Sequence, residues 1–219
     1  MITTSFTEEN YLKAIFHLSP QEAEAVSTNA IAEALQTKAA SVTDMLKKLA
    51  DKNLINYVKY QGVTLTDIGQ QAAINIIRKH RLWEVFLVDK LNFKWDEVHE
   101  LAEDLEHINS TKLIDSLEVF LGFPKVDPHG DPIPDKNGVL KEPALVPVSK
   151  MNINQTGIIS GVKEHSTLFL NYLEKAGLVL GKQVKVQDLI EFDGSVIIAL
   201  DKQLLTISRD VAKNILIAV

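Results

Sequence analysis

Residues 27–65 read STNAIAEALQTKAASVTDMLKKLADKNLINYVKYQGVTL. Apolar residues recur at helical spacing over 28–35 and again over 38–52, which predicts two short helices joined by a tight turn. The runs 54–58 and 62–65 alternate between apolar and polar residues, as expected for a small hairpin. Helix, helix and hairpin together give the outline of a winged helix-turn-helix.

In a unit of this kind the second helix lies in the major groove of DNA, and lysines beside it meet phosphates. The whole chain carries a net charge of −6, but the stretch 37–60 holds five lysines against two aspartates. We expect groove contacts from Lys38, Ser41, Thr43 and Asp44, and phosphate contacts from Lys47, Lys48 and Lys59. Alternatively, the helix pair and hairpin serve only packing and the lysines only solvation. The outline alone leaves both interpretations open.

Prolines divide the rest of the chain, because six of the seven lie between 124 and 147, where missing amide donors prevent a helix or a central strand. Before this connector the pattern is helical, beginning with a helix over about 7–18. After it come strand candidates at 157–162, 183–186, 195–200 and 204–207, and one helix at 167–177. The predicted fold class is therefore α+β and multidomain, with an SH3-like small β-barrel at the C-terminal end.

The composition excludes several classes of protein. The chain contains no cysteine, which rules out disulfides, cysteine zinc sites and thiol nucleophiles. No apolar run reaches the ~18 residues of a membrane span, and the first residues lack the basic-then-apolar order of a signal peptide. We therefore expect a soluble, cytoplasmic protein, in which any metal site uses histidine, carboxylate, amide or backbone oxygen ligands.

Residues 98–107, VHELAEDLEH, carry the strongest candidate for chemistry. On a helix, four potential ligands of this stretch share an arc of roughly 100°: His99, Glu103, Glu106 and His107. A second helical stretch places His80 and Glu84 one turn apart. Mn²⁺, Fe²⁺ and Zn²⁺ accept such mixed nitrogen and oxygen donors. The alternative is a solvated, glutamate-rich helix face, and the cluster alone does not separate the two.

The same residues fit no metalloenzyme pattern. Residues 99–103 approach the zinc-protease motif His-Glu-x-x-His, but Glu103 stands where the second histidine belongs. A di-iron bundle needs Glu-x-x-His on two helices, whereas Asp104 lies three residues before His107 and the sequence shows no second copy. We therefore expect no catalytic role.

Together these motifs resemble the diphtheria toxin repressor and manganese transport regulator family of metal-dependent repressors. The similarity extends over nearly the whole chain. It rests on residues 9–13, 41–43, 78–84, 98–107 and 127–134, the last of which is similar to the family's proline-rich turn. The resemblance implies a homodimer in which metal binding fixes the N-terminal helix and sets the spacing of two recognition helices on a palindromic operator.

The resemblance also implies three domains and two metal sites per chain. The domains are a winged helix-turn-helix DNA-binding domain over 1–75, a helical metal-binding and dimerisation domain with a proline-rich connector over 76–145, and an SH3-like, FeoA-like domain over 146–219. The family's primary site maps to Asn10, Glu103, Glu106 and His107. Its second site maps to His80, Glu84 and His99, with His165 as the nearest candidate from the C-terminal domain.

The sequence departs from the family at three positions. Glu103 stands where the iron-responsive branch has cysteine, and this harder ligand favours Mn²⁺. Asn10 stands where methionine or aspartate is expected, so its amide oxygen, Glu8 or Glu9 could be the ligand. Lys13 stands where the manganese branch can place a carboxylate, which favours two separated sites over a close metal pair.

We therefore predict a repressor that binds operator DNA as a dimer when loaded with Mn²⁺ or Fe²⁺ and controls metal-homeostasis genes. His17 and His129 have no place in the family's sites, and we expect a loop or surface role for both. Two alternatives stay open. One is an iron-specific regulator of the same family, and the other is a winged-helix protein with a structural or catalytic metal site.

Overall fold

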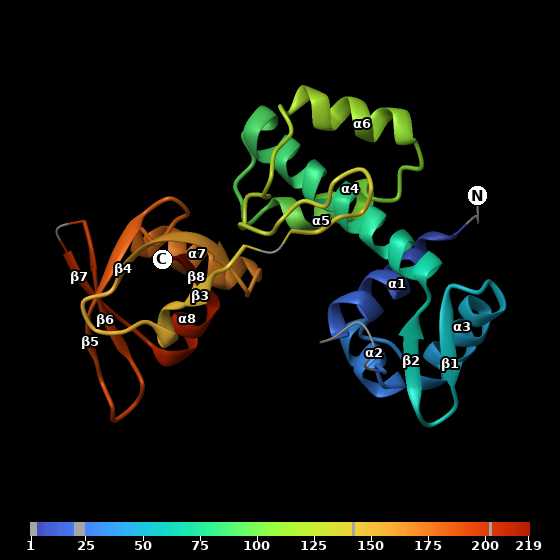
Figure 1. Cartoon of the computed structure of the whole chain (residues 1–219), viewed down its shortest axis with the longest axis horizontal. Helices are drawn as coiled ribbons and strands as arrows, with labels where there is room; N and C mark the ends of the chain where they lie inside the picture. The colour runs from blue at the N-terminus through green and yellow to red at the C-terminus, as the bar shows by residue number, and fades with distance from the viewer. Residues whose placement is uncertain (1–3, 20–24, 142, 202) are drawn as a thin grey trace. The chain divides into compact units, whose positions relative to one another are not determined.

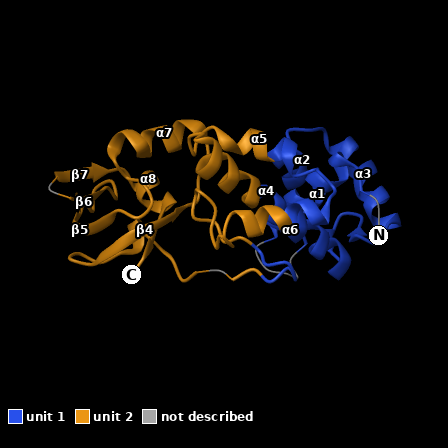
Figure 2. Cartoon of the chain, turned by 90° about the horizontal axis from the view of Figure 1, so that it is seen from above, with its two compact units in different colours: residues 1–80, 103–115, 134–139 blue, residues 81–102, 116–133, 140–219 orange. Residues whose placement is uncertain are grey.

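The computed structural model describes residues 4–19, 25–141, 143–201 and 203–219 (Figure 1). By its contacts the chain divides into two compact units (Figure 2). Unit 1 comprises residues 1–80, 103–115 and 134–139, and unit 2 comprises residues 81–102, 116–133 and 140–219. Within the described ranges, the helices are too short or too polar to cross a membrane.

Unit 1 begins with three helices, α1 (Phe6–Leu18), α2 (Thr28–Ala34) and α3 (Ala39–Asp51). Ser5 caps α1 and Ser27 caps α2, each by accepting a hydrogen bond from an amide of the first turn. The antiparallel hairpin β1 (Ile55–Val58) and β2 (Gly62–Leu65) follows. This order confirms the predicted winged helix-turn-helix.

The core of unit 1 forms where the apolar faces of these helices meet. Leu12 of α1, Ile31 of α2 and Leu46 of α3 are completely buried. On α3 the buried residues Val42, Leu46 and Leu49 recur every three or four positions, so they share one face. Burial of that face leaves the polar face of α3 toward solvent.

Three further helices follow the hairpin: α4 (Asp67–Leu91), α5 (Val98–Leu105) and α6 (Thr111–Phe120). The predicted helix over 98–107 is corrected at its end, because α5 stops at Leu105. The amide of Ile108 donates to the carbonyl of Leu105 at 3.1 Å and closes a turn there. Glu106 and His107 therefore project from this turn and not from the helix face that also carries His99. Helix α6 was not predicted.

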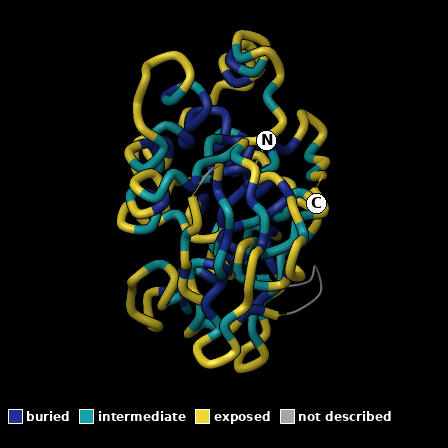
Figure 3. The backbone as a smooth tube through the Cα atoms, turned by 90° about the vertical axis from the view of Figure 1, so that its left-hand side faces the viewer, coloured by how far each residue is buried: buried dark blue, intermediate teal, exposed yellow. Residues whose placement is uncertain are grey.

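The C-terminal part of unit 2 is a six-stranded antiparallel sheet with the strand order β3-β8-β4-β5-β6-β7. The strands are β3 (Val146–Pro147), β4 (Thr156–Val162), β5 (Gln183–Leu189), β6 (Val196–Leu200), β7 (Gln203–Ile207) and β8 (Ile215–Ala218). The helices are η1 (Val148–Lys150), α7 (Thr167–Ala176) and α8 (Arg209–Asn214). Buried residues alternate with more exposed ones along β6, so one face of the sheet covers the core. Figure 3 colours the described backbone by the burial of each residue.

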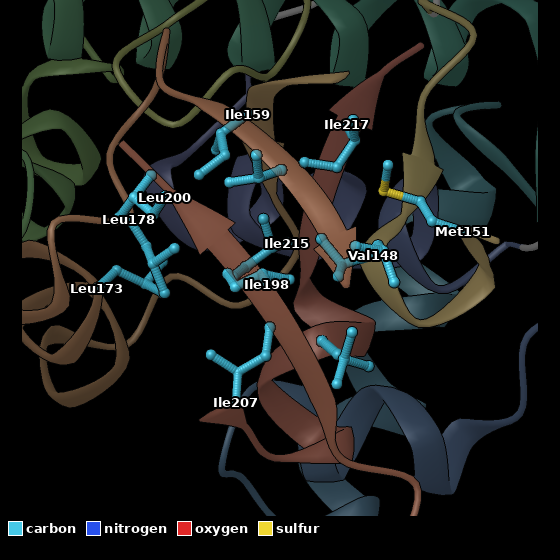
Figure 4. Close-up of a cluster of buried hydrophobic side chains, with 14 of the residues drawn as sticks. Val148, Met151, Ile159, Leu173, Leu178, Ile198, Leu200, Ile207, Ile215 and Ile217 are labelled. Carbon is cyan, nitrogen blue, oxygen red and sulfur yellow. The ribbon is translucent and has the colours of Figure 1, made fainter. Parts of the chain in front are cut away.

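That core gathers side chains from the strands and from α7 (Figure 4). Ile198, Ile215 and Ile217 are fully buried, and Leu173 of α7 packs with them. Gly177 ends α7 in the left-handed conformation with φ of 73°. The four predicted strands and α7 are confirmed with small shifts at their ends, whereas β3, β8 and α8 were not predicted. The fold class is confirmed, and the domain boundaries at 75 and 145 stay predictions.

Candidate metal centres and nucleic-acid interface

The first candidate centre joins α1 to the turn after α5, within unit 1. His107 Nδ1 lies 2.7 Å from Glu9 Oε2, and both side chains are buried. The other carboxylate oxygen of Glu9 accepts from Thr4 Oγ1 at 2.8 Å. The Phe6 ring stacks on the His107 imidazole, with ring centroids 4.5 Å apart. An acid and an imidazole thus meet where the start of α1 contacts the chain after α5.

Glu106 is the most deeply buried acid of this centre, with none of its surface exposed. Lys13 Nζ donates to both of its carboxylate oxygens, at 2.7 and 2.9 Å, and lies 3.4 Å from Glu103 Oε1. His80 Nδ1 lies 2.6 Å from Glu106 Oε2. Burial alone would raise the pKa of Glu106, but the His80 hydrogen bond and the Lys13 charge hold the pKa below its usual value. The carboxylate is therefore ionised at neutral pH.

The capping box at the start of α1 determines which acid faces this centre. Glu8 accepts from the Ser5 amide and from Lys52 Nζ, each at 2.8 Å. Burial opposes ionisation of Glu8, but these partners keep its pKa below the usual value. The next residue, Glu9, meets His107, and Asn10 is exposed. Of the three residues considered for this ligand position, Glu9 is the one bonded to His107.

The second candidate centre lies within unit 2. Glu84 of α4 meets Asp127 and His129 of the loop after α6, and one potential ligand atom from each lies within 4.8 Å of the others. All three side chains are buried. His129 does lie on a loop, but it is only 1% exposed, so the expected surface role is corrected. The loop folds back and encloses the ring against Glu84.

The hydrogen bonds of His129 determine which ring nitrogen faces the acids. Nε2 lies 2.8 Å from the carbonyl oxygen of Trp95, which can only accept, so Nε2 carries a proton. Nδ1 lies 3.6 Å from Glu84 Oε2, beyond hydrogen-bond distance. It is buried and has no hydrogen-bond partner among the described residues. A histidine that ligates a metal has this arrangement, with the second nitrogen held by a carbonyl, so the residues fit a cation.

A tight turn holds Asp127 and His129 in place. Asp127 Oδ1 accepts from two amides of its own loop, at 2.8 and 3.0 Å. Gly130 has a φ of +90°, and a Cβ there would lie 2.1 Å from the carbonyl oxygen of Ser160. The carbonyl of His129 accepts from the Val162 amide at 3.0 Å. The loop is therefore packed directly against β4, which only glycine at position 130 permits.

The second centre has an excess of negative charge. Burial, together with the charges of Glu84 and Asp131, raises the pKa of Asp127 to about 7. Burial alone would lower the pKa of His129, but the charges of Glu84 and Asp127 raise it. Arg81 contributes one positive group, with Nε 3.7 Å from Asp127 Oδ2. A group of acids that retains a proton near neutral pH favours any cation that can replace it.

The remaining predicted ligands of the second site are placed as follows. His99 Nδ1 lies 3.4 Å from Glu84 Oε1. The His165 ring stacks on His129, with centroids 4.8 Å apart, and burial lowers the pKa of His165. His80 lies one helical turn before Glu84 on α4 and is bonded to Glu106. The structure thus brings His99 to Glu84 and His165 beside His129, while His80, whose Nδ1 contacts Glu106, stays a predicted ligand of this site.

The predicted DNA-contacting residues lie on the outer side of α3 and at the tip of the hairpin. Six of the seven are exposed: Lys38, Ser41, Asp44, Lys47, Lys48 and Lys59. Thr43 is half-buried, and its hydroxyl donates to the Ala39 carbonyl at 3.0 Å. Lys47 Nζ lies 3.2 Å from Asp44 Oδ1 in an exposed pair. The side of α3 opposite its buried residues is therefore free to meet a partner.

Two ligand candidates were missed because they depend on contacts between distant parts of the chain. Asp127 and His129 lie 43 and 45 residues after Glu84, and no helical or strand spacing links them to it. A signal was present in Asp127-Pro128-His129-Gly130-Asp131, where two acids flank a histidine in a glycine turn. Glu9 was considered, but the sequence did not distinguish it from its neighbours.

Comparison with known families covers almost the whole chain. Residues 3–63 match the family model described as iron dependent repressor, N-terminal DNA binding domain. Residues 66–135 match iron dependent repressor, metal binding and dimerisation domain. Residues 146–219 match the FeoA domain. All three matches agree with the resemblance predicted from the motifs.

Individual relatives lead to the same family. The chain is 30% identical over 148 residues to the HTH-type transcriptional regulator MntR of Oceanobacillus iheyensis. The matched residues make up 68% of this chain and 94% of that one. It is 33% identical to the iron-dependent repressor IdeR of Mycobacterium bovis over 58% of this chain and 55% of that one.

Solved structures extend the similarity to the full fold. A manganese-dependent transcriptional repressor in complex with manganese has a TM-score of 0.86 and 33% identity, and covers 96% of this chain and 98% of that one. ScaR with bound Zn²⁺ has a TM-score of 0.79 and 32% identity over the same shares. These relatives are transcriptional repressors and not enzymes. The chain therefore belongs to the iron-dependent repressor family of metal-dependent transcriptional repressors.

Proposed function

We propose that this chain is a cytoplasmic repressor that binds operator DNA as a homodimer when loaded with Mn²⁺ or Fe²⁺, and that it controls metal-homeostasis genes. The observation that carries the proposal is the contact between Glu9 and His107. A carboxylate and an imidazole, both of which can ligate a metal ion, thus lie between the DNA-binding helices and the chain after α5.

For the first site we propose Glu9, Glu103, Glu106 and His107 as ligands. Lys13 supports this choice, since its ammonium already satisfies the Glu103 and Glu106 carboxylates as a stand-in cation. A bound divalent ion would supply a positive charge shared by these four side chains. Their donors are three carboxylates and one imidazole without sulfur, a set that suits Mn²⁺ and also accepts Fe²⁺.

The first site can control DNA binding because α1 carries one of its proposed ligands and also packs against the DNA-binding helices. Tyr11, Leu12 and Ile15 of α1 pack into the core that also contains Leu46 of α3. Ligation of Glu9 would therefore hold α1, and with it the helices that face DNA. Binding of metal and DNA to the same state of these helices gives a coupling free energy between the two ligands.

For the second site we propose Glu84, Asp127 and His129, with His99 as a further ligand. The buried Nδ1 of His129 and the shared negative charge support this choice. His165 and His80 stay predictions for this site. The site lies where the loop after α6 packs on β4, so a ligated cation there would tie α4 to the C-terminal part of unit 2.

The proposed dimer rests on residues 66–135, which match a dimerisation domain. Between residues 91 and 123, four large apolar side chains are between 50% and 63% exposed: Leu91, Val119, Phe120 and Phe123. A second copy of the chain would bury them and would place two α3 helices on one duplex. Lys38, Ser41, Thr43 and Asp44 would face base edges, and Lys47, Lys48 and Lys59 would face phosphates.

The proposal is tested by selecting duplexes from a random-sequence DNA pool with the full chain in Mn²⁺, and then titrating the selected duplex with Mn²⁺, Fe²⁺ and Zn²⁺. We expect binding that appears with Mn²⁺ or Fe²⁺ and disappears with a chelator. Binding that is independent of metal would contradict the proposal. A response to Fe²⁺ without a response to Mn²⁺ would establish the iron-specific alternative.

A further inference from the structure

We propose that Lys13 competes with the metal ion for the first site. Its ammonium occupies the ligand carboxylates in the metal-free protein and thereby sets the metal concentration needed for binding. This inference rests on the proposed function of that site. It concerns a residue of α1 that is not among the proposed ligands.

The geometry of Lys13 is that of a bound cation. Its Nζ lies 2.7 and 2.9 Å from the two oxygens of Glu106 and 3.4 Å from Glu103 Oε1. The lysine side chain is 15% exposed and the Glu106 side chain is fully buried. An ammonium has three donors, and three carboxylate oxygens of the proposed ligands lie within 3.4 Å of this Nζ. Lys13 has to leave Glu106 before those oxygens can ligate a metal.

Lys13 also shares a helix face with a proposed ligand. It follows Glu9 by four residues on α1, so the two side chains lie one turn apart. In this structure Lys13 ties α1 to Glu106, while Glu9 ties it to His107. Metal binding would replace the Lys13–Glu106 contact and would leave α1 attached through Glu9. The same helix carries both the ligand and the group that competes for the site.

The charge balance predicts the direction of the effect. Three carboxylates, Glu9, Glu103 and Glu106, face two lysines, since Lys79 Nζ lies 4.0 Å from Glu9 Oε2. Loss of Lys13 would remove one positive charge from beside Glu106, which is fully buried. A buried carboxylate that loses a cationic partner destabilises the metal-free protein and attracts a divalent cation more strongly. Lys13 therefore stabilises the metal-free state and weakens metal binding.

The test compares Lys13→Met with Lys52→Met in the full chain, with His129→Ala in both to remove the second site. Lys52 is a matched control, because its Nζ lies 2.8 Å from Glu8 Oε2, and Glu8 is outside the ligand set. Mn²⁺ affinity is measured by isothermal titration calorimetry, and thermal unfolding is followed with and without Mn²⁺. Lys13→Gln is a second variant in case the methionine variant folds poorly.

We expect Lys13→Met to bind Mn²⁺ at least tenfold more tightly than its parent. Its melting temperature should be lower without metal, and its rise on adding Mn²⁺ should be larger. Lys52→Met should bind Mn²⁺ within threefold of the parent. Equal or weaker Mn²⁺ binding by both Lys13 variants would overturn the role of Lys13 while leaving the site itself intact. If neither the parent nor the variants bound Mn²⁺, the proposed site and the role of Lys13 would both be wrong.

Discussion

His107 Nδ1 lies 2.7 Å from Glu9 Oε2, and this contact joins residues 98 positions apart in the sequence. Glu9 belongs to the first turn of α1, and His107 belongs to the turn that ends α5. The contact links the helices of the winged unit to the segment that carries Glu106. A cation held at this point would act on the DNA-binding helices through α1.

The first prediction concerns the ligand from α1. Glu9→Gln should lower Mn²⁺ affinity at the first site at least roughly tenfold, because it removes one charged donor of the site. Asn10→Ala should leave the affinity within threefold, since Asn10 is exposed. Calorimetric titration of the full chain measures both values. A larger loss of Mn²⁺ affinity in Asn10→Ala than in Glu9→Gln would show that Asn10 is the ligand.

The second prediction concerns metal stoichiometry. His129→Ala should reduce bound Mn²⁺ from two ions to one per chain, measured by equilibrium dialysis and elemental analysis. His17→Ala is the control, because His17 is exposed and lies on α1 outside both centres. Two ions in the His129→Ala protein would show that Glu84 and Asp127 do not form a site with this histidine.

The third prediction follows from the pKa of Asp127, which burial and neighbouring acids raise from 3.8 to about 7. Between these values the unfolded chain loses its proton before the folded one. The metal-free protein therefore loses stability as pH rises from about 4 to 7. Asp127→Asn removes this loss, so the variant should be more stable than the parent at pH 8, and its advantage should shrink toward pH 4. Urea unfolding in the presence of chelator measures the difference. An advantage that is independent of pH would contradict the assigned cause.

The fourth prediction concerns the turn that carries His129. Gly130→Ala should destabilise the protein by about 3 kcal/mol or more, because φ at this position is +90° and the new Cβ would approach the Ser160 carbonyl to 2.1 Å. Gly122→Ala is the matched control. Gly122 also has a positive φ, of +77°, but no atom lies within 4 Å of its Cβ position. The control should cost only about 1–2 kcal/mol from backbone strain. Equal losses in the two variants would show that the packing of the loop on β4 contributes nothing.

Local patterns were sufficient to predict much of this fold. The spacing of Val42, Leu46 and Leu49 identified α3, because one buried face repeats at the helical period. Strand β8 was missed, since Ile215–Ala218 is four residues long and lies at the chain end directly after α8. Its place between β3 and β4 depends on pairing with residues far away in the sequence.

In the candidate sites, too, some residues could be identified from local sequence and others only from the folded chain. The residues 99–107 were recognised as a cluster because they are close in sequence. The choice of Glu9 over Asn10 depends on the exact start of α1, since a shift of one residue turns a side chain by about 100°. The place of His129 beside Glu84 depends on how one loop folds, which no periodic pattern records.

The central claim is that metal and operator DNA favour the same state of the α1-containing unit. It is tested most directly by measuring the Mn²⁺ affinity of the full chain with and without a saturating concentration of the selected duplex. Thermodynamic linkage requires DNA to tighten metal binding by the same factor by which metal tightens DNA binding. The account predicts Mn²⁺ binding at least tenfold tighter in the presence of the duplex. Equal Mn²⁺ affinity with and without DNA would contradict it.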